Sequence, residues 1–116
     1  MRNFKVEYQS GIPSPSFEGG DAEAWVLEAF LREATSFMSQ MLAAVTDAQA
    51  IPSRPVDFGG NEISFEADAE TIAITAEWIR DDAGNECVAR IPTEEAKRLL
   101  LTWQDVLSGQ RPHPHP

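Results

Sequence analysis

Apolar residues recur every three or four positions over a long stretch in the first half of this 116-residue chain. The stripe consists of Leu27, Phe30, Leu31, Ala34, Phe37, Met38, Met41, Val45 and Ala48. Such spacing places these side chains on one face of an amphipathic helix. We expect the helix to span about residues 22–48, with Asp21 as its N-cap and a bend at Thr35 or Ser36. Pro52 and Pro55 end it, because a proline disfavours helix in the residue before it.

Three short stretches after this helix alternate between apolar and polar residues, which is the pattern of half-buried β-strands. They cover residues 62–67, 71–78 and 86–91, and Trp78 is expected to face inward with the other apolar residues of its strand. Turn-forming residues separate the stretches, so we expect an antiparallel meander with one apolar face.

The two ends of the chain complete the expected fold. Alternation over residues 4–8 predicts an N-terminal strand, whereas glycines and prolines make residues 10–20 an expected loop. A second amphipathic helix is predicted after an N-cap at Thr93, with Gly109 at its C-terminus. The order is therefore strand, long helix, three-stranded meander and C-terminal helix. This pattern predicts an α+β fold with an antiparallel sheet and both helices packed on one face.

The length and composition indicate one folded unit without a membrane anchor. We expect residues 1–109 to form a single α+β domain and residues 110–116 to form a flexible tail rich in Pro and His. No apolar run reaches the ~20 residues that cross a bilayer, and the first residues lack the apolar core of a signal peptide. The lone Cys87 fits a reducing compartment. The expected location is the cytoplasm.

Residues for catalysis or metal binding are few. Nucleophilic catalysis needs a base beside the nucleophile, but both histidines, His113 and His115, lie in the expected tail. Cys87 is expected to face inward as a small buried residue. The two imidazoles lack a third metal ligand at a useful spacing, and the glycines do not form a phosphate-binding loop. We therefore expect a protein without enzymatic activity, metal or cofactor.

The charge of the chain is strongly acidic and unevenly distributed. The formal net charge is −10, and residues 57–95 contain eleven of the 19 acidic residues but only two of the nine basic ones. Such a balance disfavours direct binding to nucleic-acid phosphates and suits a basic protein partner. An acidic surface can also serve solubility alone.

The alternation of the meander is expected to gather many of these carboxylates into one exposed field opposite the helices. The expected partner-binding residues are Asp57, Glu62, Glu66, Asp68, Glu70, Glu77, Asp81, Asp82 and Glu86. Uncharged residues are expected between these carboxylates on the same face of the sheet; they are Ser64, Thr71, Ala73, Thr75 and Val88. A field of this kind complements a cationic surface, speeds association and fixes orientation. Exposed apolar residues such as Ile79 are expected to add anchors.

The C-terminal part of the chain carries a family resemblance. The section Glu86-Cys87-Val88-Ala89-Arg90-Ile91-Pro92-Thr93-Glu94-Glu95-Ala96-Lys97-Arg98-Leu99-Leu100-Leu101-Thr102-Trp103 joins a strand, a polar turn and an amphipathic helix with paired leucines and a tryptophan. In a small acidic chain it resembles the immunity proteins of bacterial polymorphic and contact-dependent toxins, over roughly residues 62–107. The resemblance implies a non-catalytic protein that binds a cognate basic toxin domain, one that acts on nucleic acid, and blocks its active site. It assigns no binding residue by position.

Other functions are left open at this level. The same acidic field fits a nucleic-acid mimic that inhibits a defence or housekeeping protein. A small ligand-binding domain is the third possibility, with a pocket between the long helix and the sheet lined by Phe30, Met41 and Trp78. Whether the chain is a monomer or a dimer is also open.

Overall fold

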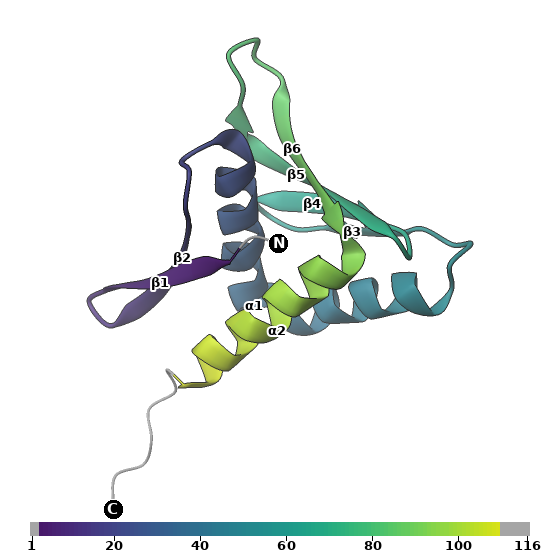
Figure 1. Cartoon of the computed structure of the whole chain (residues 1–116), viewed down its shortest axis with the longest axis horizontal. Coiled ribbons are helices and arrows are strands. Elements are labelled where there is room, and N and C mark those ends of the chain that lie inside the picture. Colours follow the sequence, from purple (N-terminus) through teal and green to yellow (C-terminus); the bar gives the residue numbers. More distant parts are fainter. Residues whose placement is uncertain (1–2, 110–116) are drawn as a thin grey trace, which may run out of the picture.

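The fold consists of a four-stranded sheet, a separate hairpin and two helices (Figure 1). The computed structural model describes residues 3–109, so the expected tail at 110–116 lies outside the described residues. The elements are β1 (Phe4–Gln9), β2 (Ile12–Phe17), α1 (Ala22–Ala50), β3 (Val56–Gly59), β4 (Ile63–Ala67), β5 (Thr71–Arg80), β6 (Glu86–Pro92) and α2 (Thr93–Gly109). Strands β3 to β6 are neighbours in chain order, and every pair is antiparallel. Both helices pack against this sheet, which confirms the predicted α+β class.

Helix α1 begins and bends close to where the sequence predicts. The side chain of Asp21 accepts a hydrogen bond from the Ala24 N–H at 2.8 Å, as an N-cap does. The helix is kinked at Phe37, whose φ of −126° and ψ of 28° are not helical, one residue beyond the expected bend. The Thr35 hydroxyl donates to the Leu31 carbonyl at 3.4 Å, a contact that often accompanies bending.

The core lies between α1, α2 and the inner face of the sheet. Phe58 and Phe65 are paired across β3 and β4, and their rings stack with centroids 5.1 Å apart. Phe30 of α1 meets Phe65 edge-on at 6.0 Å. Trp103 of α2 is buried and its indole N–H donates to the Thr35 hydroxyl at 3.2 Å, which joins the two helices near the kink.

The first correction concerns the N-terminal segment. Residues 12–17, expected to be loop, form β2, and β1 pairs with β2 rather than with the main sheet. Pro13 and Pro15 are tolerated because both strands of a two-stranded hairpin are edge strands. Ser10 and Gly11 make the turn with φ of 54° and 79°, as tight hairpins require.

The second correction concerns the main sheet, which has four strands rather than the expected meander of three. Strand β3 follows Pro55 directly and has only four residues, too few for a visible alternation. It pairs with β4 and places Asp57 directly opposite Glu66. The added strand therefore widens the outer face of the sheet and brings a second carboxylate, that of Asp57, beside Glu66.

The side chain of Trp78 faces outward, contrary to the sequence prediction. It was expected to face inward, but 77% of its surface is exposed. The register of β5 against β6 is irregular between Ala76 and Arg80, and such a bulge reverses the side on which the next residues point. Ile79, expected to be an exposed anchor, instead packs half-buried against the core.

A buried carboxylate secures the turn between β3 and β4. Glu33 of α1 is only 4% exposed, and its Oε1 accepts hydrogen bonds from the N–H groups of Glu62 at 2.7 Å and Ile63 at 3.2 Å. Gly60 makes room for it, because a Cβ at this position would lie 2.6 Å from the Glu33 Cδ. The contact fixes the turn between β3 and β4 to α1.

We expect Gly60→Ala to lower the free energy of unfolding by about 1–3 kcal/mol, the usual cost of leaving a buried polar group unsatisfied. The added methyl group displaces the Glu33 carboxylate from both N–H groups. Gly59→Ala is the matched control, because nothing lies within 4 Å of a Cβ at Gly59. Urea denaturation of both variants measures the difference. Equal losses in the two variants would contradict the role of Glu33.

Candidate functional site

The outer face of the sheet places two carboxylates side by side. Asp57 on β3 and Glu66 on β4 are direct cross-strand partners, and both are exposed. The same row continues through Ala73 on β5 to Arg90 on β6. Like charges that face each other across strands repel and lower stability. The fold therefore carries an unfavourable pair where a neutral pair would be more stable.

Neutral side chains lie beside this pair, as the sequence predicts. Ser64, Thr75 and Val88 form the next row of the outer face, in register across β4, β5 and β6. A hollow of about 380 Å³ opens on this face. It is lined by Asp57, Phe58, Ser64, Phe65, Glu66, Ala73 and Thr75. Two carboxylates thus line a hollow whose other polar side chains are the hydroxyls of Ser64 and Thr75.

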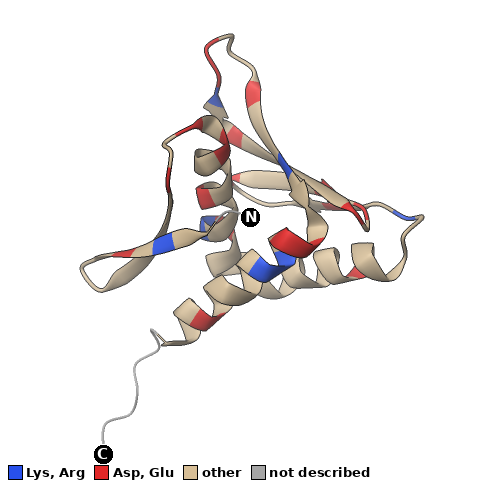
Figure 2. Ribbon diagram, in the orientation of Figure 1, with Lys and Arg blue, Asp and Glu red and all other residues tan. Residues whose placement is uncertain are grey.

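The remaining expected carboxylates lie at the two ends of the sheet (Figure 2). At one end, the Glu77 N–H donates to the Glu62 carbonyl, and the chain continues to the β5–β6 turn. That end carries Glu62, Glu77, Asp81, Asp82 and Glu86. At the other end, Asp68 and Glu70 occupy the β4–β5 turn. The nine carboxylates therefore form a central pair and two flanking groups, not one even field.

Arginines moderate this negative surface at several places. Arg32 of α1 lies 3.6 Å from the Glu62 carboxylate, measured from Nε to Oε2. Arg80 faces Glu86 across the β5–β6 pair, and Arg90 stands at the β6 end of the central row. Arg54 also lines a hollow together with Asp57 of β3. The strongest uncompensated negative charge is therefore expected at Glu66 and at the β4–β5 and β5–β6 turns.

Two aspartates shape the turns rather than projecting freely. The pKa of Asp68 is below its ordinary value of 3.8 because the N–H groups of Thr71 and Glu70 donate to its carboxylate, both at 2.8 Å. Asp81 accepts at 2.9 Å from the N–H groups of both Ala83 and Asn85. These two residues have a structural role in addition to their charge.

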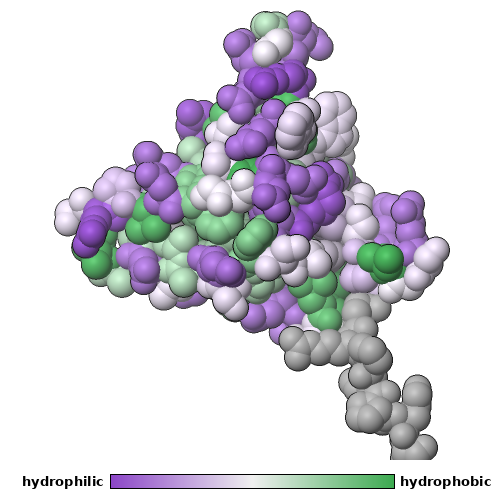
Figure 3. Space-filling model, turned by 180° about the vertical axis from the view of Figure 1, so that it is seen from behind, coloured by the Kyte–Doolittle hydropathy of each residue, from purple (hydrophilic) through white to green (hydrophobic). Residues whose placement is uncertain are grey.

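The projecting β5–β6 hairpin adds an aromatic residue to the acidic surface. Trp78 lies in the bulge, between Glu77 and the acidic turn at Asp81 and Asp82. From behind, the tip of the molecule at the top is mostly hydrophilic, whereas hydrophobic side chains lie lower (Figure 3). The alternation of apolar and polar residues did not predict that Trp78 is exposed. A bulge depends on how two strands pair, so it cannot be recognised in the alternation of one strand.

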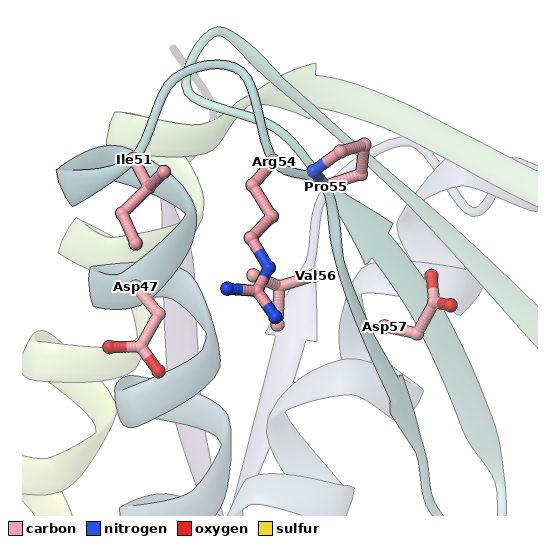
Figure 4. A pocket seen from close by; sticks show the side chains of 6 residues that line it. All are labelled: Asp47, Ile51, Arg54, Pro55, Val56 and Asp57. Atoms are coloured by element: carbon pink, nitrogen blue, oxygen red, sulfur yellow. The ribbon is translucent and has the colours of Figure 1, made fainter.

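The structure does not assemble the cavity expected under the long helix. Phe30 and Met41 are fully buried in the core, whereas Trp78 faces solvent, so the three residues do not line one space. A hollow of about 490 Å³ lies instead where α1 ends and β3 begins (Figure 4). Its lining residues are Asp47, Ile51, Arg54, Pro55, Val56 and Asp57. Arg54 points between α1 and β3, and none of these six residues is a Ser, Cys, His or Lys.

Cys87 and the two histidines are the remaining residues with candidate chemistry. Cys87 is 6% exposed on the inner face of β6, as expected from the alternation. His113 and His115 lie outside the described residues. Within residues 3–109, no three His, Cys, Asp or Glu side chains are grouped so that they could hold a metal ion. In the same part of the chain, neither helix is long and apolar enough to cross a membrane.

Comparisons with known proteins give no relative: no family model matches the chain, nor does any curated protein or any solved structure.

Replacing Asp68 by Asn should lower the melting temperature at neutral pH, because the amide keeps an acceptor but loses the charge. A lowered pKa means that the ionised carboxylate stabilises the fold. This contribution is present above pH 3.8 and disappears as the pH falls through the pKa of the folded state. The difference in melting temperature between wild type and Asp68→Asn should therefore disappear as the pH is lowered.

Thermal melts from about pH 7 to about pH 3 measure this change. Asp82→Asn controls for the loss of one negative charge from an acidic chain. If the melting temperature of Asp68→Asn stayed below that of wild type by the same amount over this range, the ionised carboxylate would not be the source of the stabilisation.

Proposed function

We propose that this protein is a non-catalytic inhibitor that binds and neutralises a cognate protein toxin through the acidic outer face of its sheet. The observation that carries the proposal is the exposed pair of Asp57 and Glu66, which face each other across β3 and β4 and both line a hollow of the outer face. The pair costs stability in the free protein. A guanidinium or ammonium group of a partner placed between the two carboxylates would remove that cost.

The distribution of charge supports a partner with a broad cationic groove. Carboxylates flank the central pair at both ends of the sheet, so an elongated positive surface can meet several of them at once. Proteins that act on nucleic acid have such surfaces, because they must bind phosphates. Occupying the groove would exclude the substrate without any chemical step. The immunity proteins of bacterial toxin systems, which part of the sequence resembles, act in this manner.

Trp78 supplies the apolar contact that charge alone does not provide. Interface energy concentrates in a few large residues, and tryptophan is among the commonest of them. An exposed indole beside an acidic turn can enter a pocket of the partner while the surrounding carboxylates guide the approach. The proposed surface thus has electrostatic steering from the sheet and an aromatic anchor on the hairpin.

The partner can be identified by affinity capture from the native cell at low and high salt, followed by mass spectrometry. The proposal expects one partner in stoichiometric amount, with a basic domain and weaker recovery at high salt. Capture of a defence or housekeeping enzyme that acts on nucleic acid would instead identify the protein as a nucleic-acid mimic. Absence of any partner at low salt would contradict both functions.

For the captured partner, Glu66→Lys should have opposite effects on folding and on binding. Lysine opposite Asp57 replaces a repulsive pair by an attractive one, which stabilises the fold by about 0.2–1 kcal/mol. The same charge repels a cationic groove, so the association rate should fall at least about tenfold at low salt. Urea denaturation and surface plasmon resonance measure the two effects.

Asp105→Lys on α2 is the matched control, because it makes the same change in net charge away from the sheet. Its association rate should stay close to wild type. If Asp105→Lys slows association as much as Glu66→Lys does, net charge rather than the outer face would be responsible.

Trp78→Ala should leave the fold intact, because the side chain is mostly exposed, and should weaken the complex about thirtyfold or more, as an interface anchor does. The loss should lie in the dissociation rate, since short-range contacts control the lifetime of a complex. Tyr8→Ala, an exposed aromatic on the separate hairpin, is the control. An unchanged dissociation rate for Trp78→Ala would remove the hairpin from the interface.

A further inference from the structure

Strand β6 forms one edge of the main sheet. Within residues 3–109, β5 is the only strand that pairs with β6 (Figure 1). β6 has seven residues, alternates regularly between exposed and buried positions, and carries its one proline, Pro92, at the end. The opposite edge strand, β3, has four residues and follows Pro55. β6 is therefore the longer edge and the one better suited to accept another strand.

The exposed residues of β6 are complementary to themselves in one antiparallel register. When two copies of β6 run antiparallel about a two-fold axis at Val88, Glu86 of each copy faces Arg90 of the other. All three residues are exposed and point to the outer face of the sheet. The axis then brings Val88, which is 38% exposed, against Val88 of the second copy. Opposite charges and paired branched residues are the favourable cross-strand combinations.

Neighbouring registers lose this match. With the axis at Cys87, Glu86 faces Val88, and Arg90 faces Gly84 of the second copy. With the axis at Ala89, Arg90 faces Val88, and Glu86 faces Pro92. Neither arrangement pairs opposite charges. Of these three registers, only the one centred on Val88 pairs opposite charges on both sides of the axis.

We propose that the protein forms a symmetric dimer in which β6 pairs antiparallel with β6 of a second copy, centred on Val88. The two sheets become one continuous sheet, with the helices of both chains on the same side and both outer faces on the other. Each chain carries a net charge of −10, but the repulsion is screened beyond about 8 Å at physiological salt. At the shorter distances of the paired strands, the two Glu86–Arg90 contacts are attractive. This dimer does not depend on the proposed toxin partner.

Sedimentation equilibrium of the full chain, from micromolar to submillimolar concentration at physiological salt, tests the dimer. We expect a mass that rises from one to two chains. Val88→Lys places two lysines opposite each other and should raise the dimer dissociation constant at least about tenfold. Thr75→Lys is the matched control, since Thr75 is the neighbour of Val88 one strand away from the edge. It should leave the constant unchanged. Circular dichroism verifies that both variants are folded.

Charge exchange tests the register. Glu86→Arg and Arg90→Glu should each weaken the dimer, and the double variant should restore it. In a Cys87→Ser background, Val88→Cys should form an intermolecular disulfide on mild oxidation, because facing strand residues lie within disulfide range. Glu86→Cys in that background should not, since its two copies stand four residues apart along the strand, about 13 Å.

Three results would overturn the proposal. They are a single-chain mass at every concentration, a dimer that Val88→Lys leaves intact, and equal cross-linking of Val88→Cys and Glu86→Cys. Weakening by Thr75→Lys alone would place the contact on the outer face instead of on the strand edge.

Discussion

Burial of the apolar face of α1 is the interaction on which the rest of the fold depends. This helix contacts α2, β2 and all four strands of the main sheet. The kink at Phe37 turns its second half into a new direction, so that one helix serves two parts of the core (Figure 1). Carboxylates of α1 also accept hydrogen bonds from the neighbouring segments: Glu28 accepts from the Phe17 N–H at 2.8 Å, and Glu33 accepts from the Glu62 N–H in the β3–β4 turn. With α1 covering one face of the sheet, the opposite face is left to carry charge.

The parts of the fold that follow a simple period could be predicted from the sequence. The stripe of α1, the alternation of β4 and β6, and the N-cap at Asp21 all appear where expected. The elements that were missed lack such a period. β2 contains two prolines that a hairpin edge tolerates, and β3 has only four residues. The exposure of Trp78 depends on an irregular pairing with β6, which is a property of two strands together.

The candidate site could be predicted in part for the same reason. Alternation placed Glu66 and the neutral residues Ser64, Thr75 and Val88 on the outer face. It did not show that Asp57 faces Glu66, because that contact requires β3 and its register. The sequence pattern around Glu62 and Glu86 also did not predict that an arginine lies beside each of them. Arg32 and Arg80 belong to other elements, α1 and β5. The grouping of charge is thus a property of the topology.

The most direct measurement is carbodiimide labelling of carboxylates in the free protein and in its complex with the captured partner, mapped by mass spectrometry. Our account predicts that Asp57, Glu66 and Glu77 lose most of their labelling in the complex, while Glu7 and Asp105 keep theirs. If Glu7 and Asp105 were protected and the sheet carboxylates still labelled, the binding surface would lie on the hairpin and α2. The central claim would then be wrong.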